Sequence, residues 1–251
     1  MRTDKIGYGC CTIAAVGFFH VGLILLAAYL CLFRVEFMNR MCDKYQVPSR
    51  LEISREDLHR VTGEMMAFVK GQEGDLDVTV TLGGDARVFF NERDRQHLED
   101  IAGMVRSGKR FLVLGGLCFL GLLLFMAHKG MLEWLCRGYL FSWLFLLGLF
   151  LIVGIWMLAD LTGFINAFHR LFFNNDRWIL NPAKDMLIRL FPRALFRDGA
   201  VLLASVLGGI HVTVTVLAVW GRGRLLQEPG PGTSRTDNPH KKGKGKRHTV
   251  A

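Results

Sequence analysis

The charged residues of the chain leave four long apolar stretches between them. No Asp, Glu, Lys or Arg occurs between Lys5 and Arg34, Arg110 and Lys129, Arg137 and Asp160, or Asp198 and Arg222. Each stretch is long enough for a helix to cross about 30 Å of hydrocarbon, and inside lipid a helix satisfies its own backbone groups. The pattern predicts an integral membrane protein with an all-α core of four transmembrane helices, at about residues 11–33, 111–128, 138–159 and 199–220.

The first apolar stretch has a second interpretation, because a secretory signal peptide also places apolar residues near the start of a chain. The stretch from Ile13 to Phe33 is longer than the apolar region of a typical signal peptide, and no clean small-residue cleavage site follows it. An uncleaved anchor explains it better. Residues 1–220 are then expected to form a single membrane domain, followed by a basic and disordered tail at 221–251.

Lys and Arg near the ends of the spans predict how the helices are oriented. The formal net charge is +9, and much of it lies in the tail, which includes the basic run from His240 to Arg247. Basic flanking segments stay in the cytoplasm, so both termini are expected there. The loops at 34–110 and 160–198 then share the extracytoplasmic side. No nucleic-acid partner is expected, since the tail has no folded basic surface behind it.

The loop at 34–110 is long enough to fold into a small α+β insert. Ser54 and Asp57 resemble a helix cap, and apolar residues then recur at helical spacing: Leu58, Val61, Met65, Phe68 and Val69. Alternation over 75–82, the turn residues at 83–85 and a return at 87–90 predict a hairpin. Asn91 caps a second helix, whose apolar stripe is Leu98, Ile101, Ala102 and Val105. The insert is therefore predicted as helix, hairpin, helix.

The loop at 160–198 is crowded with aromatic residues, which favour the membrane interface. The helix of the third span is expected to continue through Phe168, with a polar stripe of Thr162, Asn166 and His169. Asn181 and Pro182 resemble the start of a further amphipathic helix that ends near Pro192. This loop is expected to lie in the headgroup layer.

The polar groups predicted on the outer side limit the chemistry. There is no GxSxG nucleophile elbow and no HExxH zinc motif. Two histidines facing one site could exchange protons near neutral pH and support acyl transfer, although a single surface histidine is more often only polar. A metal site built from both outer histidines has no spacing signature. The candidate residues are Asn91, Glu92, Arg93, Asp94, His97, Asn166, His169, Asn174, Asn175 and Asp176.

Three segments resemble one known family. They are residues 53–58 (ISREDL), 90–100 (FNERDRQHLED) and 168–182 (FHRLFFNNDRWILNP), in the expected order and loops. They resemble the bacterial lipoprotein intramolecular transacylase family of four-helix membrane proteins, from about the first span to the fourth. One position departs from the family pattern, because Arg193 follows Pro192 where an acidic residue is expected.

The resemblance implies the reaction and its residues. The substrate would be a diacylated lipoprotein in the outer leaflet of a bacterial cell membrane. Its N-terminal α-amino group would take the sn-2 acyl chain of the attached diacylglyceryl group, leaving a lyso-form lipoprotein. The family's catalytic histidines correspond to His97 and His169, with Asn91, Arg93, Asn166 and Asp176 as supporting or substrate-binding candidates. No cofactor and no metal are implied, and a monomer is expected.

The roles of the two histidines stay open at this point. An α-amino group has a pKa of about 8, so a base must remove a proton before or during its attack. His97 is assigned as that base and His169 as the oxyanion or leaving-group partner, and the roles could be swapped. Two other functions compete with the transacylase. One is a non-catalytic module that handles lipid or lipoprotein, and the other is a metal-dependent membrane hydrolase.

Overall fold

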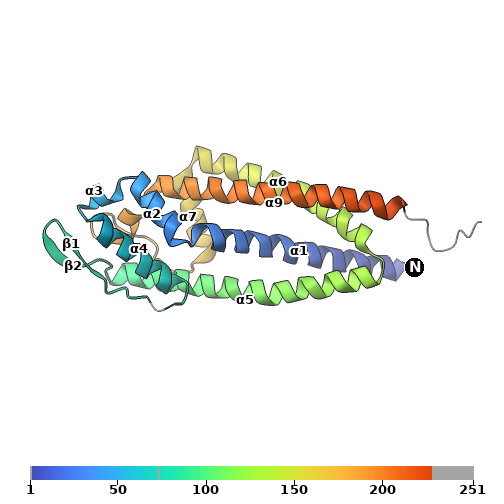
Figure 1. Ribbon diagram of the computed structural model, residues 1–251, viewed down its shortest axis with the longest axis horizontal. Helices are drawn as coiled ribbons and strands as arrows, with labels where there is room; N and C mark the ends of the chain where they lie inside the picture. The colour runs from blue at the N-terminus through green and yellow to red at the C-terminus, as the bar shows by residue number, and fades with distance from the viewer. Residues whose placement is uncertain (1, 73, 228–251) are drawn as a thin grey trace, which may run out of the picture.

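Four long helices make up most of the computed structural model, which describes residues 2–72 and 74–227. They are α1 (Arg2–Leu32), α5 (Glu92–His128), α6 (Leu132–Ala159) and α9 (Arg193–Gln227), and they run lengthwise through the molecule (Figure 1). The segments Gly7–Leu32, Glu92–His128, Leu132–Ala159 and Arg193–Gly223 are long and apolar enough to cross a membrane. The predicted helical core with four candidate membrane spans is therefore confirmed.

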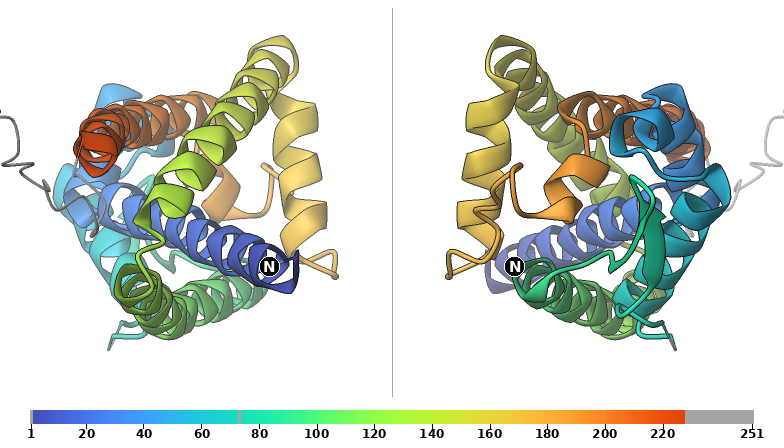
Figure 2. Two further views of the ribbon diagram at one scale, coloured as in Figure 1. Left: turned by 90° about the vertical axis from the view of Figure 1, so that its right-hand side faces the viewer. Right: turned by 90° about the vertical axis from the view of Figure 1, so that its left-hand side faces the viewer.

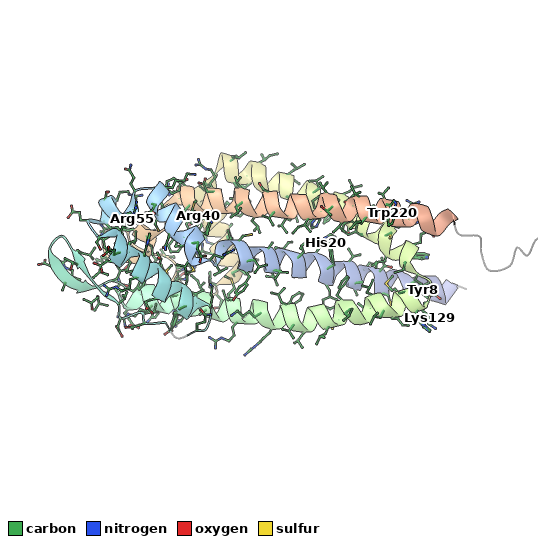
Figure 3. The ribbon with its side chains drawn as sticks, viewed as in Figure 1. Tyr8, His20, Arg40, Arg55, Lys129 and Trp220 are labelled. Atoms are coloured by element: carbon green, nitrogen blue, oxygen red, sulfur yellow. The ribbon has the colours of Figure 1, made fainter. Side chains whose placement is uncertain are left out.

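The outward faces of these helices are apolar and have no protein cover. Phe145 is 73% exposed and Leu158 is 81% exposed. Proteins in water rarely leave such extended apolar surface open, whereas in a bilayer the lipid covers it. A polar residue lies inside instead, because His20 is buried about halfway along the bundle (Figure 3). The exposed residues Lys129 and Arg55 lie near its two ends.

At one end of the bundle the chain between α1 and α5 folds into a small α+β unit. It consists of α2 (Val35–Lys44), α3 (Val47–Leu51), α4 (Arg55–Val69), β1 (Thr79–Leu82) and β2 (Asp85–Val88). The predicted order of helix, hairpin and helix is confirmed. The two short helices α2 and α3 were not predicted, because the buried face of α2 is only Phe37, Met38 and Cys42, too few to show a helical period.

The helix cap and the hairpin turn of this unit form at the residues where the sequence predicts them. The Ser54 hydroxyl accepts the N–H of Asp57 at 3.0 Å and caps α4. The antiparallel strands pair from Thr79 with Val88 to Leu82 with Asp85. Gly83 and Gly84 both have positive φ, 59° and 94°, which a two-residue hairpin turn requires. The core of the unit includes Leu58, Val61, Met65, Phe89, Phe90 and Leu98.

Helix α5 joins this unit to the membrane without a break. Its first half, residues 92–110, is rich in charged residues, and its second half, 111–128, is apolar. A 37-residue helix is about 55 Å long, so the charged half extends beyond the hydrocarbon that the apolar half crosses. The early turns of α5 therefore stand outside the membrane-spanning segment.

The loop at 160–198 differs from its prediction at its first helix. The third span does not continue through Phe168, because α6 ends at Ala159 and a separate helix, α7 (Leu161–Phe172), follows. Between them Asp160 has φ −147° and ψ 80°, and its carboxylate accepts the N–H of Gly163 at 2.8 Å. An acidic side chain that caps a new helix ends the old one. Helix α7 lies on the opposite side of the bundle from α4 (Figure 2).

The end of this loop also differs. Asn181 and Pro182 form a turn, in which the Asn181 side chain accepts the N–H of Ala183, and α8 (Met186–Leu190) begins only after Asp185. Helix α9 begins at Arg193, before the predicted start of the fourth span at 199. It continues through Gln227, so the first part of the predicted tail is helical. Residues 228–251 of that tail lie outside the described residues.

Candidate active site

His97 lies on the second turn of α5 and faces the protein. Only 4% of the residue is exposed. The helix is fixed at this point by Asn91 and Asp94, which form a capping box at its start. Because the cap sets where α5 begins, it also sets which direction the His97 side chain takes.

His169 lies on α7 and meets His97 from across the molecule. The two ring centroids are 5.7 Å apart with an angle of 39° between the planes. The Phe173 ring touches both, at 5.2 Å from His97 and 5.7 Å from His169. Trp178 stacks on His169 at 5.1 Å and 27°. The two predicted histidines are thus brought together, in a setting of aromatic rings.

The hydrogen bond of His169 determines its tautomer. Its Nδ1 atom lies 2.7 Å from the carbonyl oxygen of Ile165. A carbonyl oxygen only accepts, so Nδ1 carries the proton and donates it. When the ring is neutral, Nε2 therefore holds a free lone pair. This accepting nitrogen has no hydrogen-bond partner among the described residues.

His97 is held differently. Its Nδ1 atom is buried and has no hydrogen-bond partner in the described chain. The pKa of His97 is lowered from 6.5 to about 4, mainly by burial and then by the neighbouring His169, while Asp100 acts in the opposite direction. The ring is therefore neutral at pH 7. A neutral imidazole still offers one N–H and one lone pair to a substrate.

Asp94 and Asn91 connect α5 to the segment that precedes α9. The buried Asp94 carboxylate accepts the N–H groups of Met186 at 3.0 Å and Leu187 at 3.2 Å. Burial raises the pKa of Asp94, against these backbone hydrogen bonds, which lower it. The Asn91 amide donates to Asp185 at 2.7 Å. The side chains of both residues are occupied by these hydrogen bonds, which fix α5 against the following segment.

A second set of contacts fastens the segment after α7 to α5. The Asp100 carboxylate accepts from Asn175 at 3.0 Å and from Arg177 at 3.1 Å. Arg93 donates to the backbone carbonyl of Asp176 at 2.9 Å. These contacts hold the residues immediately before Trp178, whose ring stacks on His169. The segment 174–178 therefore links α5 to the ring of His169.

The remaining predicted candidates are on the surface. Asn166 is exposed one turn before His169, and Asp176 and Asn174 are also exposed. A surface pocket between the start of α5 and the segment after α7 is lined by Glu92, Arg93, Gln96, Asp176 and Arg177. No set of three or more His, Cys, Asp or Glu side chains gathers at a metal-binding distance in the part of the chain that the structure describes.

Three residues of this site were missed by the sequence reasoning. Asp100 lies three residues after His97, a spacing that puts both on one side of a helix and could have identified it. Trp178 and Phe173 stood out only as members of an aromatic segment. Their contact with the histidines depends on how α7 folds back, which no periodic pattern reveals.

Solved structures share this architecture. The lipoprotein intramolecular transacylase Lit from Bacillus cereus superposes with a TM-score of 0.67, covering 88% of this chain and 97% of that one at 14% identity. A variant of that protein with one histidine replaced by alanine gives the same score, at 14% identity over 90% and 96%. At such low identity these similarities show the fold alone.

No curated protein matches the chain in sequence. The family model described as lipoprotein intramolecular transacylase Lit matches residues 13–196, which is well over half of the chain. The matched range contains both candidate histidines and every contact that holds them. The chain belongs to the lipoprotein intramolecular transacylase family.

Proposed function

We propose that this multi-pass membrane acyltransferase moves the sn-2 acyl chain of a diacylglyceryl-cysteine lipoprotein onto the lipoprotein's own α-amino group. Family membership supports a transacylase that acts on lipoproteins. The observation that carries the chemical proposal is the His97–His169 pair, because three of its four ring nitrogens have no partner in the described chain. Of the three, only His97 Nδ1 is fully buried, so the two Nε2 atoms are available to a substrate.

The hydrogen bond of His169 favours the swapped assignment of roles. Its Nε2 lone pair accepts a proton from the attacking amine, and the carbonyl of Ile165 stabilises the imidazolium that forms. His97, neutral because of its lowered pKa, donates its N–H to the oxyanion of the tetrahedral intermediate. The protein supplies no nucleophile, since the substrate's own amine is one.

The proton count closes within one substrate molecule. The amine nitrogen bonds to the ester carbon and gives its proton to His169. The bond from that carbon to the sn-2 oxygen then breaks, and His169 returns the proton to this oxygen as a hydroxyl. Because amine and ester belong to one molecule, holding them together lowers the entropic part of the barrier. The step needs no cofactor.

The four supporting candidates divide into two proposed roles. Asn91 and Arg93 position the site, since the first caps α5 and the second holds the carbonyl of Asp176. Asn166 and Asp176 have exposed side chains near the histidines, so they are proposed to contact the glyceryl or peptide part of the substrate. A polar rim of this kind suits a substrate whose head group is polar and whose chains are not.

The site is proposed to open to the outer leaflet, with both termini in the cytoplasm and the protein acting as a monomer. Helix α7 supports the placement, because one of its faces is apolar and uncovered: Phe168, Leu171 and Phe172 are 40%, 78% and 54% exposed. An apolar face beside polar ends suits a helix lying in the headgroup layer. Lipid esters also lie at that depth.

Expression in bacteria whose lipoproteins are diacylated tests the function. Wild-type protein should produce the lyso-form, detected as N-acylated lipopeptides by mass spectrometry. His97→Ala and His169→Ala should each abolish it. His128→Ala, an exposed histidine at the other end of α5, is the matched control and should leave the yield unchanged. If both the His97 and the His169 variant give the full yield of the lyso-form, a non-catalytic role in handling lipid or lipoprotein would be favoured for the protein.

A further inference from the structure

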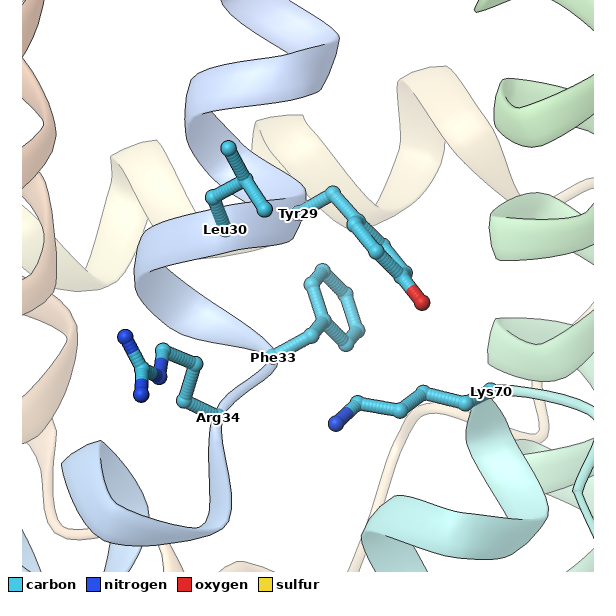
Figure 4. Close-up of a pocket in the computed structure, with 5 residues that line it drawn as sticks. All are labelled: Tyr29, Leu30, Phe33, Arg34 and Lys70. Atoms are coloured by element: carbon cyan, nitrogen blue, oxygen red, sulfur yellow. The ribbon is translucent and has the colours of Figure 1, made fainter.

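A pocket lies where α1 leaves the apolar segment, away from the histidine pair. It has a volume of about 280 Å³ and is lined by Tyr29, Leu30, Phe33, Arg34 and Lys70 (Figure 4). Leu32 is the last residue of the first candidate span, so the pocket lies at the level where hydrocarbon gives way to head groups. Lys70 is the C-cap residue of α4, and α4 lies on the opposite side of the bundle from α7, the helix that contains His169 (Figure 2).

The polar wall of the pocket is cationic. Lys70 reaches beneath Phe33 toward Arg34 (Figure 4), and its side chain forms no ion pair in the described chain. Lys109 of α5 lies behind it, with its ammonium 2.6 Å from the carbonyl of Lys70 and 5.1 Å from the Tyr29 ring. Two cationic side chains, Arg34 and Lys70, thus line the pocket, and the Lys109 ammonium contacts the backbone of Lys70.

One carboxylate competes for these cations. Glu36 pairs with Arg34 at 3.3 Å, but the two side chains are 67% and 64% exposed. Ion pairs between such exposed groups contribute little, so Arg34 is free to exchange this partner for another anion. The Tyr29 hydroxyl lies on the other side of Phe33 from the Arg34 guanidinium (Figure 4), so the two cations are the anion-binding groups of the pocket.

The other wall is apolar and continues into the membrane. Leu26 and Leu30 are four residues apart on α1, so they lie on one face, and they are 43% and 54% exposed. This stripe leads along α1 directly to the pocket. A ligand that fits both walls carries a phosphate at its head and a hydrocarbon chain below it.

We propose that this pocket binds an anionic phospholipid of the surrounding leaflet. Arg34 and Lys70 hold its phosphate, and one acyl chain lies along Leu26 and Leu30. Guanidinium and ammonium groups are the usual partners of phosphate oxygens. A zwitterionic lipid would bring its own cation against these residues. The lipid is a bound neighbour and not the acyl donor, because the pocket is separate from the histidine pair.

Native mass spectrometry of the full chain, released from discs with equal amounts of phosphatidylglycerol and phosphatidylcholine, tests the proposal. Wild type should retain phosphatidylglycerol preferentially. Arg34→Gln with Lys70→Gln should lower that preference about fivefold for each cation removed. Glu36→Gln should raise it. The control of equal charge, Arg50→Gln with Arg87→Gln, removes exposed cations elsewhere and should keep the wild-type preference.

Three results would overturn the proposal. The first is an unchanged preference in the double variant, and the second is an equal loss in the control. The third is displacement of the lipid by inorganic phosphate, which would mean that the acyl chain adds nothing. If the double variant melts early, the charge-conserving pair Arg34→Lys and Lys70→Arg replaces it. That pair must retain the preference, and its loss there would also contradict the site.

Discussion

Two pairs of histidines lie in this molecule, and their surroundings differ in one decisive respect. The rings of His97 and His169 are 5.7 Å apart and tilted by 39°, at the end of the bundle. The rings of His20 and His211 are 5.1 Å apart and stacked at 20°, inside the bundle. In the first pair one ring nitrogen of four has a partner in the described chain, and in the second pair all four do.

The inner pair forms a directed chain of hydrogen bonds. His211 Nδ1 lies 3.1 Å from the carbonyl of Leu207, which only accepts, so Nδ1 carries the proton. His211 Nε2 then accepts from His20 Nδ1 at 3.1 Å. His20 Nε2 in turn faces the Ser142 hydroxyl at 2.9 Å, which also lies 2.9 Å from the carbonyl of Tyr139. With both rings neutral, His20 Nε2 and the carbonyl of Tyr139 share the single proton of the Ser142 hydroxyl.

The two pairs differ in how many ring nitrogens have no partner, and this difference supports the proposed catalytic role of the outer pair. In hydrocarbon an unsatisfied polar group costs several kcal/mol, so buried ring nitrogens need partners. All four nitrogens of the inner pair have one, and these contacts join α1, α6 and α9. The outer pair leaves both Nε2 atoms without a partner in the described chain, at the end of the bundle. Residue type and ring distance alone would not have distinguished the two pairs.

The largest effect is expected from removing the accepting nitrogen of His169. In His169→Asn the amide can still donate to the carbonyl of Ile165, but the imidazole nitrogen that would accept the proton is gone. The initial rate of lyso-lipopeptide formation from a synthetic diacylated lipopeptide should fall by about 10²–10⁴-fold, the usual contribution of a general base. A variant that keeps more than a tenth of the wild-type rate would return the base role to His97.

The lowered pKa of His97 predicts an acid-sensitive fold. In the unfolded chain this histidine has a pKa near 6.5, and in the folded protein about 4, so the unfolded state binds more protons between these values. Stability is therefore fully present above pH 6.5 and decreases as the pH falls toward 4. The loss from this residue is roughly 3 kcal/mol. Melting temperatures from pH 7 to 4 should show a flatter profile for His97→Phe than for wild type, and parallel profiles would contradict the assignment.

The inner pair should respond in stability and not in chemistry. His211→Leu leaves the His20 N–H without an acceptor, at a cost of roughly 1–3 kcal/mol. The melting temperature should fall by a few degrees, while turnover per folded molecule stays within about twofold. The double variant His20→Leu and His211→Leu removes both partners and should recover part of the loss. A large fall in turnover with no change in melting would mean that the inner pair takes part in catalysis.

The sequence predicted what depends on local pattern. The spans followed from gaps in charge, and the caps at Ser54 and Asn91 from side chains that satisfy nearby N–H groups. The break at Asp160 was missed, because one capping carboxylate outweighs an apolar period that continues through Phe168. The pairing of His97 with His169 was implied by family resemblance, since their contact depends on how α7 folds back, which no local pattern encodes.

The smallest effect is expected from Asp100, which holds the segment that packs against His169. Asp100 does not touch the histidine rings by hydrogen bond; it holds Asn175 and Arg177, and the next residue, Trp178, stacks on His169. Asp100→Asn keeps the size of the side chain but removes the ion pair with Arg177. Partly exposed ion pairs contribute about 0.2–1 kcal/mol, so the rate should fall by no more than about fivefold. The fall should lie in kcat, because the His169 ring is less well positioned while the surface that binds the substrate is unchanged.

The control variant is Glu99→Gln, which removes a neighbouring exposed carboxylate that forms no contact with this segment. Its rate should match that of wild type. An equal fall in both variants would assign the effect to surface charge, and a change in KM alone would place Asp100 in substrate binding.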